Sequence, residues 1–272
     1  MILETIQISQ NATLTAILHG PSEEMQSDSA LRRPAVVICP GGAYEFCSVR
    51  EADAPASAFL NMGLQVFILL YSCGEAAGGK QPLTEAAQSV RLVRERADEW
   101  WIDPQKILIC GFSAGGHLAA SLGVHWDDPA LAERCGVQDA SVLRPDAMVL
   151  GYPVITAGQY AHRNSIVNVS RASGEPEQYW SLEENVSEKT PPTFLWHTMT
   201  DNSVPVENSL LFVQQLHRYG VACECHLFEF GRHGMSVATR EVDAASRAVH
   251  AWVGLCQTWL SARFGPLGGD AQ

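Results

Sequence analysis

Ser113 lies at the centre of the pentapeptide Gly111-Phe-Ser-Ala-Gly115, which has the form G-x-S-x-G. The pentapeptide directly follows the apolar run KILIC and opens a stretch of small residues suited to a helix. A strand, a tight turn and a helix in this order form a nucleophile elbow, in which a strained backbone presents the serine Oγ. The flanking glycines suit such a turn because side chains there would crowd the serine. The pattern predicts Ser113 as a nucleophile; the alternative is a glycine-rich helix start without chemistry.

A serine is a poor nucleophile at neutral pH and needs a base that a carboxylate orients. Asp201 comes just after the apolar run TFLW, and His233 comes just after the run CECHLFEF, within the sequence GRHG. Because parallel strands end at one edge of a sheet, we expect both residues to lie near Ser113. Glu207 is the rival acid, but it begins a helix candidate, where the helix dipole favours a carboxylate. His197 lies inside the preceding strand candidate and is expected at most to support Asp201.

Acyl transfer also needs hydrogen-bond donors for the oxyanion. The loop PGGAY follows the apolar run AVVIC and resembles the glycine loop that presents a backbone N–H in esterases. We expect Gly42 or Ala43 to supply one donor and the backbone N–H of Ala114, next after the serine, to supply the other. A plain glycine turn is the alternative for this loop.

A second glycine-rich segment points to a different class of function. Residues 74–80 match the first seven positions of a phosphate-binding loop and end in Lys80. The eighth position holds Gln81, where Mg²⁺ binding needs a Ser or Thr hydroxyl, and Pro82 lacks an N–H. We therefore expect a surface loop here and no nucleotide binding.

The elements that must position these residues alternate between short apolar runs and helix-like stretches. Runs that are apolar on both faces indicate a parallel sheet covered by helices. An alternating-polarity segment at the start predicts a hairpin, and the final helix is expected over residues 243–262. The pattern predicts a doubly wound, mostly parallel α/β sheet of about eight strands, with helices on both faces. The expected central strands are residues 35–39, 66–71, 107–110, 147–150 and 193–196.

No linker divides the chain, so we expect one domain over residues 1–272. The one long irregular stretch, residues 156–192, is expected to be a binding loop or small cap over the site, or else a disordered insertion. The tail, residues 265–272, is rich in glycine and is expected to be disordered.

Composition excludes several classes of partner. The chain has 272 residues and a formal net charge of −12, which disfavours nucleic acid and acidic membrane surfaces. No apolar run reaches the roughly 18 residues of a membrane span, and the first residues lack the pattern of a signal peptide. The eight cysteines are scattered, without the paired spacing of a zinc site. We expect a soluble cytoplasmic protein without a metal; the oligomeric state is open.

With these motifs in place, the chain resembles the α/β-hydrolase superfamily, and within it bacterial esterases of the acetylxylan-esterase type, from about residue 34 to 260. The resemblance rests on CPGGAY, the pair Arg50-Glu51, WWIDPQKILICGFSAGGHLAASLG, GYPVIT, PPTFLWHTMTDNSVPVENSLLF and GRHG. It implies the α/β-hydrolase fold, the same three catalytic residues, and deacetylation of acetylated sugars or other short acyl esters without a cofactor. The chain departs from the family at Ala43, where glycine is usual, and in residues 162–168.

Candidate substrate contacts and two alternative functions complete the expectations. Glu51 is expected to contact substrate hydroxyls or to be a charge at a helix N-terminus. Aromatic and polar residues near the loops are expected to line a sugar site or simply to pack; they are Tyr44, Tyr160, His162 and Trp180. The alternatives to a short-acyl esterase are a serine peptidase on the same fold and a catalytically inactive binding protein.

Overall fold

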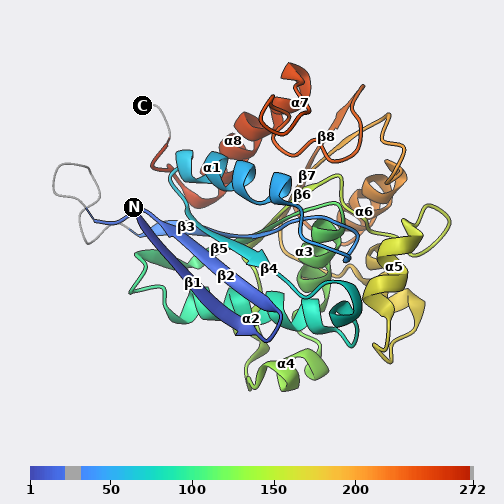
Figure 1. The fold of residues 1–272 in the computed structure, drawn as a ribbon, viewed down its shortest axis with the longest axis horizontal. Coiled ribbons are helices and arrows are strands. Elements are labelled where there is room, and N and C mark those ends of the chain that lie inside the picture. The colour runs from blue at the N-terminus through green and yellow to red at the C-terminus, as the bar shows by residue number, and fades with distance from the viewer. Residues whose placement is uncertain (22–31, 270–272) are drawn as a thin grey trace.

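An eight-stranded sheet forms the centre of the computed structural model, which describes residues 1–21 and 32–269 (Figure 1). The strand order across the sheet is β1-β2-β4-β3-β5-β6-β7-β8. The β1–β2 hairpin is antiparallel, β2 pairs with β4 antiparallel, and the remaining neighbours are parallel. The strands are β1 (Ile2–Ser9), β2 (Ala12–Leu18), β3 (Arg33–Cys39), β4 (Gln65–Leu70), β5 (Ile102–Phe112), β6 (Ala147–Gly151), β7 (Thr193–Thr198) and β8 (Cys223–Phe228). The expected mostly parallel α/β sheet is confirmed.

Two apolar layers explain why the central runs are hydrophobic on both faces. In β3, Val37 packs into one layer and its neighbours Val36 and Ile38 pack into the other. Helices α2 and α3 cover the first face, whereas α1 and α8 cover the second, as Figure 1 shows on opposite sides of the sheet. The helices are α1 (Asp53–Asn61), α2 (Gln81–Glu95), α3 (Ala114–His125), α4 (Pro129–Cys135), α5 (Arg163–Ser170), α6 (Glu207–Arg218), α7 (Arg247–His250) and α8 (Trp252–Phe264).

The C-terminal helix begins later than the sequence predicts and is interrupted. Asp243 has a φ of 51°, which a right-handed helix does not allow, so the expected start at this residue is wrong. The Ser246 hydroxyl instead accepts a hydrogen bond from the Val249 N–H and caps α7. Residue 251 separates α7 from α8.

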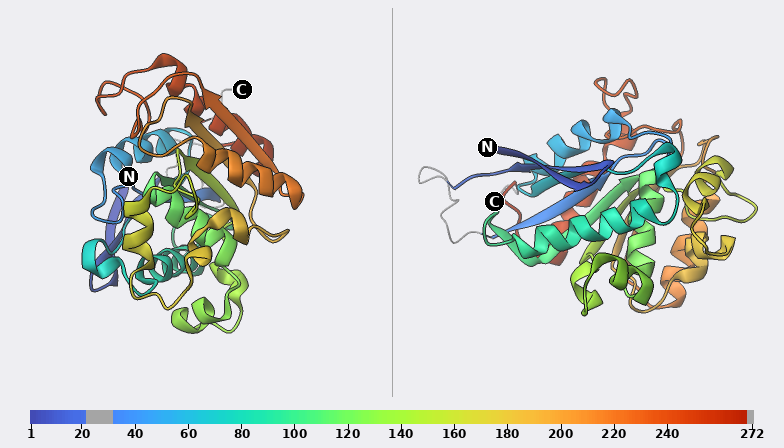
Figure 2. Two further views of the ribbon diagram at one scale, coloured as in Figure 1. Left: turned by 90° about the vertical axis from the view of Figure 1, so that its right-hand side faces the viewer. Right: turned by 60° about the horizontal axis from the view of Figure 1, so that its bottom comes forward.

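The long stretch between β6 and β7 contains α5 and two short 3-10 helices, Glu177–Trp180 and Leu182–Asn185. Figure 2 shows α5 at the end of the molecule where α3 begins. The start of the expected disordered tail is packed: Leu267 is buried, and the Gly269 N–H donates to the Met62 carbonyl. Residues 270–272 of that tail lie outside the described residues.

The lysine of the phosphate-loop-like segment is buried. The Lys80 ammonium lies 2.5 Å from Glu175 Oε1 and 3.6 Å from Asp128 Oδ2. It therefore joins the start of α2 to the 156–192 segment and the start of α4, and its charge is already neutralised. This position differs from the surface loop that the sequence predicts, because two acidic residues far along the chain converge on Lys80.

Candidate active site

Ser113 occupies the turn between β5 and α3 in a strained backbone conformation, with φ 54° and ψ −120°. A Cβ at Gly111 would lie 2.0 Å from the Gly115 carbonyl oxygen, and one at Gly115 would lie 2.0 Å from the Cys39 carbonyl oxygen. Only glycine fits at either position. The sequence pattern therefore does form an elbow, and the conformation at Ser113 stores roughly 1–3 kcal/mol of strain.

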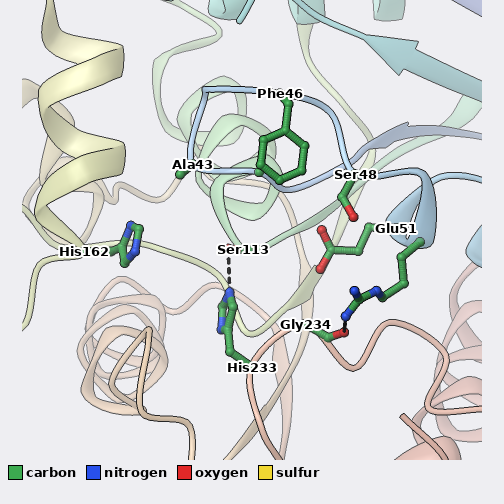
Figure 3. A pocket seen from close by; sticks show the side chains of 10 residues that line it. Ala43, Phe46, Ser48, Glu51, Ser113, His162, His233 and Gly234 are labelled. Carbon is green, nitrogen blue, oxygen red and sulfur yellow. Dashed lines mark hydrogen bonds between the residues drawn. The ribbon is translucent and has the colours of Figure 1, made fainter. Parts of the chain in front are cut away.

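Three side chains from three strand ends form a continuous hydrogen-bond series. Ser113 Oγ lies 2.8 Å from His233 Nε2, and His233 Nδ1 lies 2.7 Å from Asp201 Oδ2 (Figure 3 shows the first of these bonds). Asp201 follows β7 and His233 follows β8, so the parallel sheet brings both to the end of β5. The geometry is that of a serine activated by an oriented imidazole.

The environment of Asp201 favours its charged form. Its Oδ1 accepts hydrogen bonds from the backbone N–H groups of Ser203 and Val204 at 2.9 and 3.0 Å. Burial alone raises the pKa of this carboxyl, but hydrogen bonds from His197 and His233 outweigh it and hold the pKa well below its usual range. His197 Nε2 lies 3.4 Å from Asp201 Oδ2, which agrees with its expected supporting position.

The glycine loop after β3 lies beside Ser113. No acceptor among the described residues takes a hydrogen bond from the backbone N–H of Gly42, Ala43 or Ala114. Ala43 has a φ of 55°, in the left-handed region that glycine adopts more easily. The loop thus keeps the shape of a glycine turn although alanine stands at this position, and its amides are free to bind an anionic oxygen.

A pocket of about 270 Å³ opens above Ser113. Figure 3 shows His162 on the opposite side of Ser113 from Glu51, with the Phe46 ring near the loop that carries Ala43. Phe46 is 58% exposed although it is aromatic. The lining residues are Gly42, Ala43, Phe46, Ser48, Arg50, Glu51, Ser113, His162, His233 and Gly234.

Two expected substrate contacts are wrong, because the structure places them in the core. Tyr44 is fully buried and its hydroxyl lies 2.9 Å from His117 Nδ1. Trp180 is also fully buried, and its carbonyl lies 3.0 Å from the other ring nitrogen of His117. Burial lowers the pKa of His117 to about 4. A neutral histidine thus connects the glycine loop to the 156–192 segment beneath the site.

The other expected contacts differ from one another. His162 lines the pocket, and its Nδ1 lies 2.9 Å from the Ser165 hydroxyl. Tyr160 is 36% exposed, but it does not line this pocket. Glu51 borders the pocket but is only 3% exposed, because its carboxylate is bound by Gly41 and Tyr152. Contact with substrate hydroxyls is therefore not its main interaction.

Several site residues were not expected from the sequence as site residues. Phe46, Ser48 and Gly234 line the pocket, and Tyr152 lies beneath His233 with ring centroids 5.0 Å apart. Phe46 and Ser48 lie between CPGGAY and the pair Arg50-Glu51, and Gly234 is the last residue of GRHG. Attention to the whole loop around each motif could therefore have found these three residues. Tyr152 belongs to the motif GYPVIT, but the sequence does not indicate its contact with His233, because the two residues meet only through the fold.

A metal site needs several ligating side chains close together, and a membrane span needs a long apolar helix. Within residues 1–21 and 32–269, no group of three or more His, Cys, Asp and Glu side chains lies together as metal ligands would. No helix in this described part of the chain is long and apolar enough to cross a bilayer.

Solved structures share this architecture. The acetyl ester-xyloside bifunctional hydrolase from Caldicellulosiruptor lactoaceticus is 32% identical with a TM-score of 0.81, and the match covers 96% of this chain and 97% of that one. Among curated proteins, endo-1,4-beta-xylanase B of Butyrivibrio fibrisolvens is 38% identical over 221 residues, or 78% of this chain and 34% of the relative. The acetylxylan esterase of Xylanibacter ruminicola is 29% identical over 214 residues, or 75% and 42% of the two chains.

The chain thus spans between a third and a half of the length of these two curated relatives. A family model also matches more than half of the chain: residues 24–216 match the model of the BD-FAE family, and they include the glycine loop, the elbow and Asp201. Together with the sheet topology and the structural neighbours, this match shows that the chain belongs to the BD-FAE family of α/β hydrolases.

Proposed function

We propose that this protein is a serine esterase that removes short acyl groups, above all acetyl, from small or carbohydrate esters. The observation that carries the proposal is the hydrogen-bond series from Ser113 through His233 to Asp201, at 2.8 and 2.7 Å, whose first two members line a pocket. A nucleophile, a base and an orienting carboxylate in contact are the groups that acyl transfer needs.

In the proposed mechanism, Ser113 Oγ attacks the ester carbonyl while His233 Nε2 takes its proton. Asp201 holds the imidazole in the tautomer with the proton on Nδ1 and stabilises the imidazolium that forms. The N–H groups of Ala114 and of Gly42 or Ala43 bind the oxyanion, and the loss of one such donor typically costs about 10²–10³ in rate. His233 then protonates the leaving alcohol, and the acyl group stays bound to Ser113 Oγ. In the second half, a water molecule attacks this acyl-enzyme while His233 takes its proton, and His233 returns the proton to Ser113 Oγ as the acid is released.

The pocket supports a small substrate with a polar alcohol part. Its volume of about 270 Å³ is just below the usual range for small-molecule sites, which begins at about 300 Å³. Ser48, Arg50 and His162 offer hydrogen bonds along its wall, and the exposed Phe46 ring offers an apolar face. Polar groups beside an aromatic face suit a sugar ring. The printed names of two relatives, an acetylxylan esterase and an acetyl ester-xyloside hydrolase, support the same substrate class.

Hydrolysis of p-nitrophenyl esters from C2 to C12 tests the chemistry. We expect turnover that falls steeply beyond C4 and that decreases at least about 10⁴-fold in Ser113→Ala. Ser121→Ala is the matched control, because it removes a buried hydroxyl from α3, the helix that begins directly after Ser113. The Ser121 Oγ lies 3.4 Å from His117 Nδ1 and not from the hydrogen-bond series. A folded Ser113→Ala protein that keeps more than a few per cent of the wild-type turnover would contradict the proposal.

Acetate release from acetylated xylo-oligosaccharides tests the alcohol part of the substrate. Release by the wild type but not by Ser113→Ala is the expected result. Serine-dependent turnover of the chromogenic esters without acetate release would keep the esterase and reject the sugar substrate.

A further inference from the structure

Glu51 is a buried carboxylate beside the pocket that the proposed mechanism does not use. It ends the short 3-10 helix Val49–Glu51, which is separated from the glycine loop by four residues, and is 3% exposed. A buried charge is unfavourable unless hydrogen bonds compensate it. The hydrogen-bond partners that offset the burial of the Glu51 carboxylate therefore indicate its role.

The first partner is the glycine loop itself. Glu51 Oε2 accepts a hydrogen bond of 2.8 Å from the Gly41 N–H. The Gly41 carbonyl accepts one of 2.9 Å from the Ser48 N–H, so both backbone groups of Gly41 are held. In a trans peptide the C=O and the following N–H point in opposite directions. The Gly41 carbonyl thus directs the Gly42 N–H away from Ser48, and the orientation of a proposed oxyanion donor depends on the backbone that Glu51 holds.

The second partner leads to the catalytic base. Glu51 Oε1 accepts a 2.6 Å hydrogen bond from the Tyr152 hydroxyl, and the Tyr152 oxygen accepts one of 2.8 Å from the Ser236 N–H. Tyr152 also packs against the His233 ring, with centroids 5.0 Å apart and planes at 72°. Ser236 is three residues after His233, so this branch holds the loop that carries the base.

A third contact joins Ser236 back to the residue before Glu51. The Ser236 hydroxyl donates a 2.7 Å hydrogen bond to the Arg50 carbonyl, next to Glu51. Tyr152 has a φ of 35° and Ser236 has a φ of 50°, so both residues adopt backbones that non-glycine residues rarely take. Surrounding contacts must maintain such conformations. The Glu51 carboxylate contacts both the glycine loop, through Gly41, and Tyr152.

We propose that Glu51 is a positioning residue: it sets where the glycine loop, which carries the proposed oxyanion donors, lies relative to the loop that carries His233. It acts through Gly41 on one side and through Tyr152 and Ser236 on the other. Charge-assisted hydrogen bonds of this kind are shorter and stronger than neutral ones, so they suit the alignment of two loops. This inference rests on the proposed esterase function and adds a residue to it.

The chain offers a matched control for a merely structural role. Glu85 on α2 is buried as well, and its carboxylate accepts hydrogen bonds from the Ser72 N–H at 2.8 Å and the Ser72 hydroxyl at 2.6 Å. It does not line the pocket. Glu51→Gln and Glu85→Gln therefore make the same chemical change in similar surroundings, and only the first touches the site.

The test compares kcat, KM and thermal stability of both variants on a p-nitrophenyl acetate substrate. In Glu51→Gln the amide NH₂ must face one of two donors, so we expect kcat to fall about 10- to 100-fold with KM within about threefold, as for an interaction made in the transition state. We expect affinity for butylboronic acid, which forms a tetrahedral adduct with serine, to fall in parallel. Glu85→Gln is expected to lower the melting temperature and leave kcat within about twofold.

Each other outcome overturns the inference. If kcat falls equally in both variants, Glu51 is only structural; if KM rises while kcat holds, Glu51 contacts substrate instead. Wild-type kinetics in Glu51→Gln, with Ser113→Ala inactive, would reject the positioning role and leave the esterase intact, whereas an active Ser113→Ala would reject the proposed function itself. Should Glu51→Gln not fold, Tyr152→Phe keeps the carboxylate and cuts only the branch to His233; unchanged kcat there would contradict the inference.

Discussion

Two buried glutamates, Glu51 and Glu85, solve the same local problem in different parts of the molecule. Each carboxylate accepts a hydrogen bond from a backbone N–H and at least one from a hydroxyl group. Glu85 additionally accepts from the Ser9 hydroxyl at 2.5 Å, which joins α2 to the N-terminal hairpin. In both places, hydrogen bonds replace the water that burial removes.

What differs is the backbone that each carboxylate holds. Glu85 holds Ser72, just after β4, and contacts no residue of the hydrogen-bond series Ser113–His233–Asp201. Glu51 holds Gly41, where a Cβ would lie 2.9 Å from Ser113 Cβ, and Tyr152, which packs against His233. Burial and hydrogen bonding alone therefore do not distinguish a positioning residue from a structural one, whereas the identity of the held segments does.

Among the changes that test the difference between the two regions, Gly41→Ala is expected to lower esterase activity the most. Its Cβ would lie 2.4 Å from Glu51 Oε2 and 2.8 Å from the Phe112 carbonyl, so the loop must move away from both Glu51 and the elbow. We expect esterase activity to fall by about 10³-fold or more, because both the donor and the serine are displaced. Steady-state kinetics of the purified variant measure the loss.

Gly74→Ala is the matched change near Glu85. Gly74 has a φ of 63°, and no atom lies within 4 Å of the place that a Cβ would occupy, so alanine meets no clash and adds backbone strain of about 1 kcal/mol. Alanine also keeps the backbone N–H that donates a 2.7 Å hydrogen bond to the Tyr44 carbonyl. Its activity is expected to stay near that of the wild type. Equal losses of activity in the two variants would remove the distinction between the two regions.

Tyr152→Phe is expected to have an intermediate effect. Loss of the hydroxyl leaves Glu51 Oε1 and the Ser236 N–H without their partner, and we expect kcat to fall about tenfold. Because the two residues act through one network, the double variant with Glu51→Gln should lose less activity than the product of the single losses. Independent, multiplicative losses in this double-mutant cycle would contradict a shared network.

The smallest expected effect is the pH dependence of stability at Glu51. Burial raises the pKa of this carboxyl above its ordinary value, and the hydrogen bond from Tyr152 and the charge of His233 only partly oppose the rise. The unfolded chain, with a Glu pKa of about 4.3, therefore ionises first, so stability is lost as the pH rises from there through the folded pKa. Glutamine does not titrate.

The free energy of unfolding of the wild type, minus that of Glu51→Gln, should consequently decrease as the pH rises above about 4. Urea denaturation of both proteins across this range measures the difference. A difference that stays constant, or that increases with pH, would show that burial does not dominate at Glu51.

The sheet and the hydrogen-bond series were largely predictable because their signals are local. Apolar runs indicate buried parallel strands, and the ends of such strands share one edge, so Ser113, Asp201 and His233 could be placed together from the sequence. Gly111 and Gly115 were also predictable, since the elbow leaves no space for a Cβ at either position. The late start of the final helix was not predictable from the sequence. Asp243 adopts a left-handed backbone conformation in a loop, and that conformation depends on the segments around it.

The contacts around the site could not be predicted with the same success. Tyr44 and Trp180 are aromatic residues in loops beside the site, and the sequence does not say whether such rings face solvent or His117. Tyr152 follows β6 and reaches Glu51 across 101 positions of the chain. Contacts of this kind have no periodicity, because they join segments that meet only after the sheet has formed.

The sequence by itself thus determined the strands, the elbow and the three residues at the strand ends, because hydrophobic period and glycine spacing act over a few neighbouring residues. Only the tertiary structure decided that Glu51 is enclosed between Gly41 and Tyr152, that Tyr44 lies in the core, and which loop residues line the pocket. The physical reason is that burial and hydrogen-bond partners depend on the packing of distant segments, whereas backbone preferences are set locally.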